Sequence, residues 1–173
     1  MSEAFSIREA GARDWPLIWA VLETVFRAGE TYAYAQDITV EQARQAWMEL
    51  PAKTLVCVRP DGEIVGTYVL KANQPGQGAH VCNCGYVVSA QARGLGVATA
   101  LCEHSQALAL ELGFRAMQFN LVVSSNEGAV RLWQQLGFRI VGTVPEAFRH
   151  PRLGYVDAFV MYKHLVPATR DPD

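Results

Sequence analysis

The sequence predicts one α/β domain in which a mixed sheet is covered by helices on both faces. Strand-like and helix-like segments follow each other as strand, helix, helix, a run of strands, then strand, helix, strand, helix, strand, strand. The 173 residues are 50% hydrophobic and 18% charged, which suits one soluble domain with a real core. We expect this domain to span residues 1–166 and residues 167–173 to form a flexible tail.

The first third of the chain is predicted to hold one strand and two helices. The alternating segment 5–10 indicates the strand. Asp14 stands as the N-cap of a helix that has Pro16 in its first turn and ends near Gly29. Its apolar stripe is Leu17, Val21, Leu22 and Val25. Thr39 to Gln42 fits a capping box that starts a second helix, which runs through Trp47 and stops at Pro51.

The rest of the chain alternates between strands and helices. Residues 53–73 predict a hairpin with its turn at Pro60–Gly62, and strands are expected at 80–88, 115–123, 138–144 and 155–163. A helix from Gly96 to Leu112 would bury Val97, Leu101, Leu108 and Leu112. A helix from Asn126 to Leu136 would bury Ala129, Leu132, Trp133 and Leu136. Residues 145–154 are expected to form a loop.

Charge and hydropathy exclude several classes of protein. A net charge of −2 argues against broad nucleic-acid binding, which needs a basic face. The sequence contains no run of about 18 apolar residues, so no membrane span is predicted. The first residues lack a basic region followed by an apolar core, so a cytoplasmic location is expected.

The four cysteines are Cys57, Cys82, Cys84 and Cys102. Cys82 and Cys84 would point to the same side of a strand, as a zinc-binding pair could. No second Cys or His pair stands at a suitable spacing, so buried reduced thiols are favoured and no metal is expected.

A glycine pair marks the segment "QARGLG", where a predicted strand gives way to a helix. Glycines there would let a ligand approach the free N–H groups of the helix start, which suit a phosphate or pyrophosphate. The alternative is that Gly94 and Gly96 only permit a tight turn. A Walker loop is absent, and the dinucleotide fingerprint lacks its third glycine because that position is Thr99.

Two motifs together resemble the GNAT family of N-acetyltransferases. Gln91-x-x-Gly94-x-Gly96 after an apolar strand is similar to the acyl-CoA pyrophosphate loop of that family. "NEGAVRLWQQLGF", Asn126 to Phe138, is similar to its second signature. The resemblance covers nearly the whole chain, and it implies a mostly antiparallel sheet that splays between two central strands.

Four further segments are similar to the fungal L-azetidine-2-carboxylate N-acetyltransferases, which acetylate proline-like secondary amines. They are "HVCNCGYVV", "FNLVVSSN", "RIVGTVPEAFR" and "YVDAFVMYKHL". A GNAT enzyme with another substrate class could share them.

The resemblance implies acetyl-CoA as cosubstrate and a set of residues to bind it. The backbone of Val87 and Val88 would bind the pantetheine arm. The pyrophosphate would lie on Arg93, Gly94, Leu95, Gly96, Val97 and Ala98. Asn126 would bond the pantetheine or adenosine part, although it could equally be an ordinary N-cap.

The expected acid–base residues of the family are missing. Many members have a Glu on the splayed strand and a Tyr in the later helix, where this chain has Asn83 and Trp133. An indole supplies a proton to a thiolate far less easily than a tyrosine does. Asn83 is therefore the catalytic candidate, because its amide could accept the amine N–H or orient a water. The alternative is that it supports a strand irregularity.

The acceptor is expected to lie near the facing strand. Asn120 and the backbone of Leu121 could hold a carboxylate, although Asn120 could also be a satisfied core amide. Tyr32 and Tyr34 could wall the pocket beside Glu30, or serve as core anchors. His80 and His104 are more typical of surface or structural positions, whereas Tyr155 and Asp157 could reach the acceptor.

The sequence thus predicts an enzyme that moves an acetyl group to a small-molecule amine, such as an amino acid or a proline-like imino acid. Alternatives are a drug amine, a protein N-terminus, or an acyl-CoA-binding module without catalysis. The family often dimerises through its C-terminal strands, so a homodimer is also expected.

Overall fold

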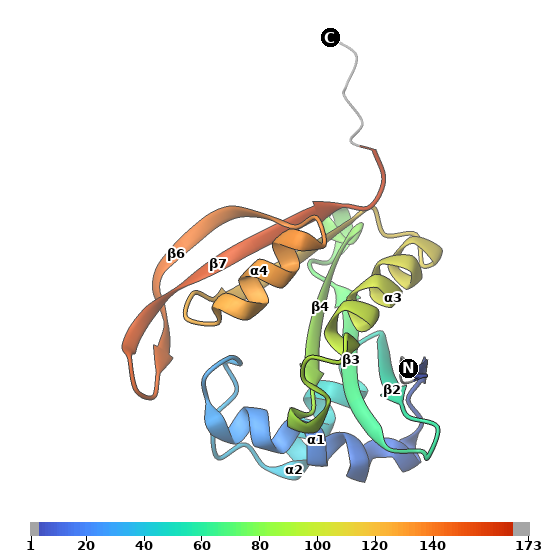
Figure 1. Cartoon of the computed structure of the whole chain (residues 1–173). Coiled ribbons are helices and arrows are strands. Elements are labelled where there is room, and N and C mark those ends of the chain that lie inside the picture. The colour runs from blue at the N-terminus through green and yellow to red at the C-terminus, as the bar shows by residue number, and fades with distance from the viewer. Residues whose placement is uncertain (1–3, 168–173) are drawn as a thin grey trace.

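Seven strands form one sheet in the order β1-β2-β3-β4-β5-β7-β6 in the computed structural model, which describes residues 4–167 (Figure 1). Neighbouring strands are antiparallel except β4 and β5, which are parallel. The predicted mixed, mostly antiparallel sheet is confirmed. The strands are β1 (Ser6–Glu9), β2 (Lys53–Val58), β3 (Ile64–Ala72), β4 (Val81–Val88), β5 (Ala116–Val123), β6 (Arg139–His150) and β7 (Gly154–His164).

Helices cover both faces of this sheet. They are α1 (Trp15–Ala28), α2 (Val40–Arg44), α3 (Val97–Glu111) and α4 (Glu127–Gln135), with short helical turns η1 (Ala12–Asp14), η2 (Gln45–Glu49), η3 (Gly76–Gly78) and η4 (Ala90–Ala92). Successive strand residues face opposite sides, so β2 packs Leu55 and Cys57 among residues of α3 and α4. Val56 and Val58 pack on the other face with residues of α1. The sheet is therefore buried on both faces.

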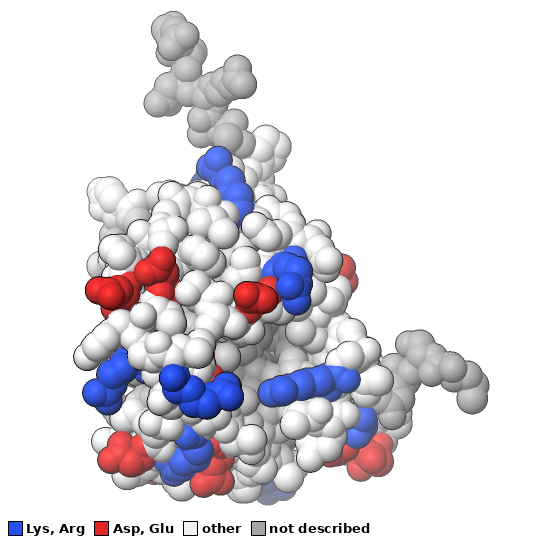
Figure 2. Space-filling model, turned by 60° about the vertical axis from the view of Figure 1, so that its left-hand side comes forward, with Lys and Arg blue, Asp and Glu red and all other residues white. Residues whose placement is uncertain are grey.

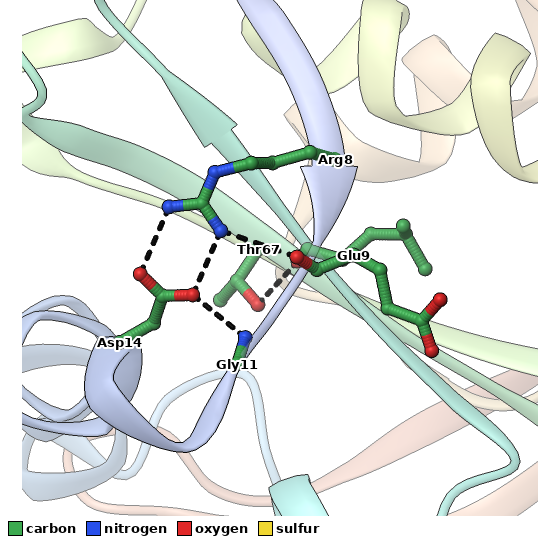
Figure 3. Close-up of polar contacts among 6 residues, drawn as sticks. Arg8, Glu9, Gly11, Asp14 and Thr67 are labelled. Carbon is green, nitrogen blue, oxygen red and sulfur yellow. Dashed lines mark hydrogen bonds and ion pairs between the residues drawn. The ribbon is translucent and has the colours of Figure 1, made fainter.

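The starts of the first two helices differ from each other. The Thr39 capping box is present, because Thr39 Oγ1 accepts from the Gln42 amide at 3.1 Å and Gln42 returns a bond to the Thr39 amide at 3.0 Å. Asp14 occupies the predicted N-cap position of α1, but its side chain makes no capping hydrogen bond to that helix. Its carboxylate instead accepts from Arg8 and from the Gly11 amide, and so joins β1 to the helix (Figure 3).

The predicted apolar stripes are partly wrong. Leu17 is 51% exposed, and the buried side of α1 is formed by Trp15, Ile18, Val21, Leu22 and Phe26. Leu112 is 45% exposed because α3 has already ended at Glu111, and small residues such as Ala109 take the buried places. The predicted hairpin turn is present between β2 and β3, where the Gly62 amide donates to the Arg59 carbonyl.

The loop predicted at 145–154 is mostly strand. β6 continues to His150, and β7 begins at Gly154. The pairing is interrupted between Val144 and Phe148 by a bulge, in which the Glu146 amide donates to Asp157 Oδ1 at 3.0 Å. Because β6 is an edge strand, Pro145 in this bulge does not break the sheet.

The two central strands separate soon after they meet. β4 and β5 pair only at Val81 with Ala116 and at Cys82 with Met117. From Asn83 onward, β4 keeps β3 as a partner on one edge and has no strand on the other. The predicted splay is thus present, and it leaves backbone groups of β4 without ladder partners.

No helix within residues 4–167 is long and apolar enough to cross a membrane. The predicted tail lies outside the described residues, apart from Pro167.

Candidate active site

A cleft of about 980 Å³ opens where β4 and β5 part. Its walls come from β4, β5, the starts of α3 and α4, and the loop after α1. Figure 2 shows a hollow on one face of the molecule, with basic and acidic side chains interspersed around it and no dense acidic patch. Of the sequence-predicted site residues, all but Leu95 line this cleft.

One side of the cleft is built from backbone at the start of α3. Gly94 and Gly96 have φ values of 79° and 80°, a left-handed conformation that side chains other than that of glycine rarely adopt. A Cβ built on either glycine would meet nothing within 4 Å, so the space in front of both is open. No side chain caps α3, whose first amides are therefore available to an anion. We call this part, residues 92–99, the amide loop.

Two predicted cofactor residues are placed differently. The Leu95 amide already donates to the Ala92 carbonyl, and its side chain is 46% exposed. The Asn126 side chain lines the cleft and does not cap α4. Asn126 thus occupies the N-cap position predicted for α4, but its side chain makes no capping hydrogen bond and remains available to a ligand.

The other side of the cleft is built from aromatic side chains. Tyr32 and Tyr34 stack with ring centroids 6.0 Å apart, and Tyr32 meets Trp47 edge-on at the same distance. The Tyr32 hydroxyl donates to the Tyr86 carbonyl at 2.8 Å. A Cβ on Gly85 would lie 3.1 Å from that hydroxyl, so glycine there lets the ring lie close to β4. The two tyrosines both wall the cleft and anchor its aromatic cluster.

Asn83 lies where β4 separates from β5. Its Nδ2 donates to the Gln118 carbonyl of β5 at 2.9 Å and bridges the two strands. Since a carbonyl can only accept, this bond uses the NH2 group and leaves Oδ1 as an acceptor. The structure therefore gives Asn83 the supporting role that the sequence left as an alternative, and an oxygen that could receive an amine N–H.

Asn120 is exposed, so its interpretation as a core amide is wrong. Its Nδ2 donates to Asn73 Oδ1 at 2.6 Å, and its Oδ1 accepts from Gln118 Nε2 at 3.0 Å. This amide is already engaged on both sides. Pairing of β5 with β7 is interrupted between Phe119 and Val122, and such a bulge frees backbone groups at Asn120 and Leu121.

Burial keeps the acidic hydroxyls and the thiol of the cleft protonated. It raises the pKa of Tyr32, of Tyr34 and of the Cys84 thiol above their usual values. The pKa of Tyr86 is raised in the same way. None of these four groups can serve as a base near neutral pH.

Four residues considered from the sequence lie off the cleft, namely His80, His104, Tyr155 and Asp157. His104 bonds the Tyr68 hydroxyl at 2.8 Å, and the Asp157 carboxylate accepts from the Glu146 amide. Tyr155 is 66% exposed. Neither Tyr155 nor Asp157, which could reach the acceptor by sequence, is among the residues that line the cleft.

Sequence reasoning missed Trp47 and Lys71, which both line the cleft and which no local motif marks. Gly85 also lines it and was not named as a site residue, although it belongs to the segment "HVCNCGYVV". Trp133 also lines it, is 9% exposed, and packs its ring 5.1 Å from Tyr86 and 5.2 Å from Phe119. The described residues contain no group of three or more His, Cys, Asp or Glu side chains that could hold a metal, and all four cysteines are free and buried.

Comparison with known proteins gives a family for this arrangement. Residues 16–138 match the model of the acetyltransferase (GNAT) family. A GCN5-related N-acetyltransferase from Kribbella flavida has the same fold with a TM-score of 0.88 and 48% identity, over 93% of this chain and 98% of that one.

Two curated relatives are enzymes. N-acetyltransferase aca1 of Schizosaccharomyces pombe is 29% identical over 83% of this chain and 76% of its own length. The L-methionine sulfoximine/L-methionine sulfone acetyltransferase of Pseudomonas paraeruginosa is 32% identical over 96% of this chain and 98% of its own. The chain belongs to the acetyltransferase (GNAT) family and is an acetyl-CoA-dependent acyltransferase.

Proposed function

We propose that this enzyme transfers the acetyl group of acetyl-CoA to the amine of a small amino acid or proline-like imino acid. The observation that carries the proposal is the two-sided cleft: open amides on one side, and an aromatic pocket that includes Asn83 on the other. Acetyl-CoA would enter from the amide loop and place its thioester at the separation of β4 and β5. The acceptor would enter from the aromatic side.

The amide loop would bind the pyrophosphate. Arg93, Gly94, Gly96, Val97 and Ala98 line the cleft there, and their backbone would supply most of the binding. At Val87 and Val88, the edge of β4 that faces β5 has no strand partner, so its backbone groups would bind the pantetheine arm of acetyl-CoA. The Asn126 side chain would hydrogen-bond the same ligand. Leu95 has no part in this proposal, because its amide is already bonded within the loop.

The reaction would be direct attack. The amine nitrogen forms a bond to the thioester carbon, the carbon–sulfur bond breaks, and the thiolate leaves with its electron pair. The amine loses a proton to water, while Asn83 Oδ1 orients the attacking N–H. A thiol has a pKa of about 8.5, so its thiolate is a good leaving group and needs no enzyme acid. This mechanism is consistent with Trp133 at the helix position and with the protonated tyrosines.

The size and charge of the acceptor side favour a small acceptor. Among residues 4–167, Glu30 is the one carboxylate that lines the cleft, and it is paired with Arg152 at 2.8 Å. A polycationic drug would need more acidic groups than this pocket offers. The relative from Pseudomonas is named for two amino acid analogues, which supports the same class of acceptor. A proline-like ring would fit against the stacked rings of Tyr32 and Tyr34. Primary amino acids carry the same amine and carboxylate, so they belong to the same class of acceptor.

A panel assay tests this proposal. Release of free CoA thiol is measured with acetyl-CoA and L-proline, azetidine-2-carboxylate, methionine sulfone, an aminoglycoside or a short peptide. We expect turnover with one or more of the first three and little with the last two. Preference for the aminoglycoside or the peptide would contradict a small amino acid acceptor and indicate a drug amine or a protein N-terminus instead. Binding of acetyl-CoA without turnover of any amine would support a non-catalytic module.

We also propose that the enzyme is a cytoplasmic homodimer and that it binds neither nucleic acid nor a membrane. Four free, buried thiols suit a reducing compartment. β6 is an edge strand with Ile140, Val141 and Val144 exposed, which suits pairing with a second copy. Sedimentation of the wild type and of Val141→Lys would test the dimer, which should dissociate in the variant.

A further inference from the structure

Lys71 differs from the other two lysines of this chain. Lys53 pairs with Glu9 at 3.0 Å, and Lys163 donates to Gln106 Oε1 and to the Leu136 carbonyl. Lys71 has no ion pair or side-chain hydrogen bond with any residue between 4 and 167, and it lines the cleft. An ammonium group in this position has its charge available for a ligand.

The register of the sheet places Lys71 beside Asn83. The two residues are direct partners in the antiparallel pair of β3 and β4. Direct partners project from the same face of a sheet, with Cβ atoms about 4.5–5.5 Å apart. Lys71 and Asn83 therefore rise together from the face that also carries Gly85 and is covered by Tyr32.

We infer that Lys71 binds the carboxylate of an α-amino or α-imino acid acceptor, an inference that rests on the proposed function. In such a molecule the amine and the carboxylate are attached to one carbon. A single acceptor can thus offer its N–H to Asn83 Oδ1 and its carboxylate to Lys71. Of the groups named from the sequence, the Asn120 side chain is already bonded to Asn73 and Gln118. The backbone groups of Asn120 and Leu121, which the bulge frees, carry no charge to match that of a carboxylate.

The charges around this pair are consistent with an anion at Lys71. Three charged side chains line the cleft: Glu30, Lys71 and Arg93. Glu30 is neutralised by Arg152, and Arg93 belongs to the amide loop on the cofactor side. Lys71 is therefore the unpaired charge on the acceptor side.

The same charge has a chemical effect on the reaction. A cation close to the amine disfavours its protonated form and lowers its pKa. Since the mechanism needs a free amine and has no enzyme base, Lys71 would both hold the acceptor and raise the fraction that can attack. Lys71 is in this role a specificity-determining residue.

The test compares Lys71→Met, Lys71→Arg and the control Lys53→Met with two substrates, L-proline and L-prolinamide. We expect Lys71→Met to lower kcat/KM for the acid at least tenfold and for the amide less than twofold. Lys71→Arg should keep most of the acid activity, and Lys53→Met should change neither. The pH at which acid activity reaches half its maximum should rise in Lys71→Met. Comparing variants on each substrate cancels the different amine pKa values of the two compounds.

The outcomes separate this inference from the proposed function. Equal losses for acid and amide in Lys71→Met, or no loss for either, would overturn the carboxylate site while leaving amine acetylation intact. If the wild type acetylates no amine of the panel although it binds acetyl-CoA, the proposed function fails and the inference fails with it.

Discussion

The two sides of the cleft are built by different means. The amide loop is one continuous segment, residues 92–99, whose useful groups are backbone amides exposed by two glycines with positive φ. The acceptor side is assembled from side chains that are far apart in the sequence, among them Tyr32, Trp47, Lys71 and Asn83. A site made of backbone depends on local conformation, whereas a site made of side chains depends on which elements the fold brings together. Substitutions on one side should therefore change the function of that side and leave the function of the other side intact.

The largest effect should come from Trp133, which lines the cleft where β4 and β5 separate. Its buried ring packs against Tyr86 of β4 and Phe119 of β5. We expect Trp133→Ala to lower the free energy of unfolding by about 3–5 kcal/mol, because it leaves a cavity between the separated strands. Denaturant unfolding would measure this loss, and Trp19→Ala, at a less buried tryptophan, is the control. Equal losses in the two variants would contradict a central packing role.

Gly96→Val should damage the cofactor side alone. A branched side chain at a φ of 80° is strained and would stand in the open space before the amides. We expect affinity for acetyl-CoA, measured by calorimetry, to fall at least tenfold, about 1.4 kcal/mol.

The matched control is Gly113→Val, which has a φ of 90° and open space at the other end of α3. It should carry a similar strain and bind acetyl-CoA normally. If a folded Gly96→Val protein keeps its affinity, the amide loop is not the pyrophosphate site.

Asn83→Ala should affect the acceptor side and the chemical step. We expect kcat to fall about tenfold, with acetyl-CoA affinity changed less than twofold, because the oxygen that we propose to orient the amine is lost. Asn73→Ala, outside the cleft lining, is the control and should keep its kcat.

The pH profile sharpens this expectation. Activity should rise with pH along a limb that follows the amine pKa of each substrate. A limb that stays at one pH for amines of widely different pKa, and that disappears in Glu30→Gln, would identify an enzyme base and contradict the mechanism.

The smallest effect should come from Asp14, which lies away from both sides of the cleft. The Arg8 hydrogen bonds hold the pKa of this carboxyl below its usual value. Its contribution is therefore present above about pH 4, where the unfolded carboxyl is also ionised, and is lost as pH falls through the lower folded pKa. We expect Asp14→Asn to cost about 1 kcal/mol at pH 7 and less at pH 3.

Unfolding of Asp14→Asn, Arg8→Met and the double variant would measure the coupling directly. Additive losses at pH 7 would show that the pair contributes nothing to stability, despite its two short hydrogen bonds.

The amino-acid sequence by itself determined the order of the elements, the mixed sheet, its separation at β4 and the place of the amide loop. The element order and the amide loop depend on short-range patterns: alternation in strands, the Thr39 capping box, and glycines at a strand-to-helix turn. The separation at β4 was instead implied by the resemblance to the GNAT family. The sequence-based errors have local causes too, since Pro145 resembles a loop residue until the edge position of β6 is known.

Only the tertiary structure decided the acceptor side. Lys71 stands beside Asn83 because of the register of β3 and β4, and Tyr32 reaches Gly85 because α1 and its loop cover that face. It also showed that the Asn120 amide is engaged and that Asn126 is available. Long-range register and packing are set by the whole core, so no motif near Lys71 could reveal its neighbours. A site made of backbone groups can therefore be predicted from one segment of sequence, whereas a pocket made of distant side chains can be identified only once the fold is known.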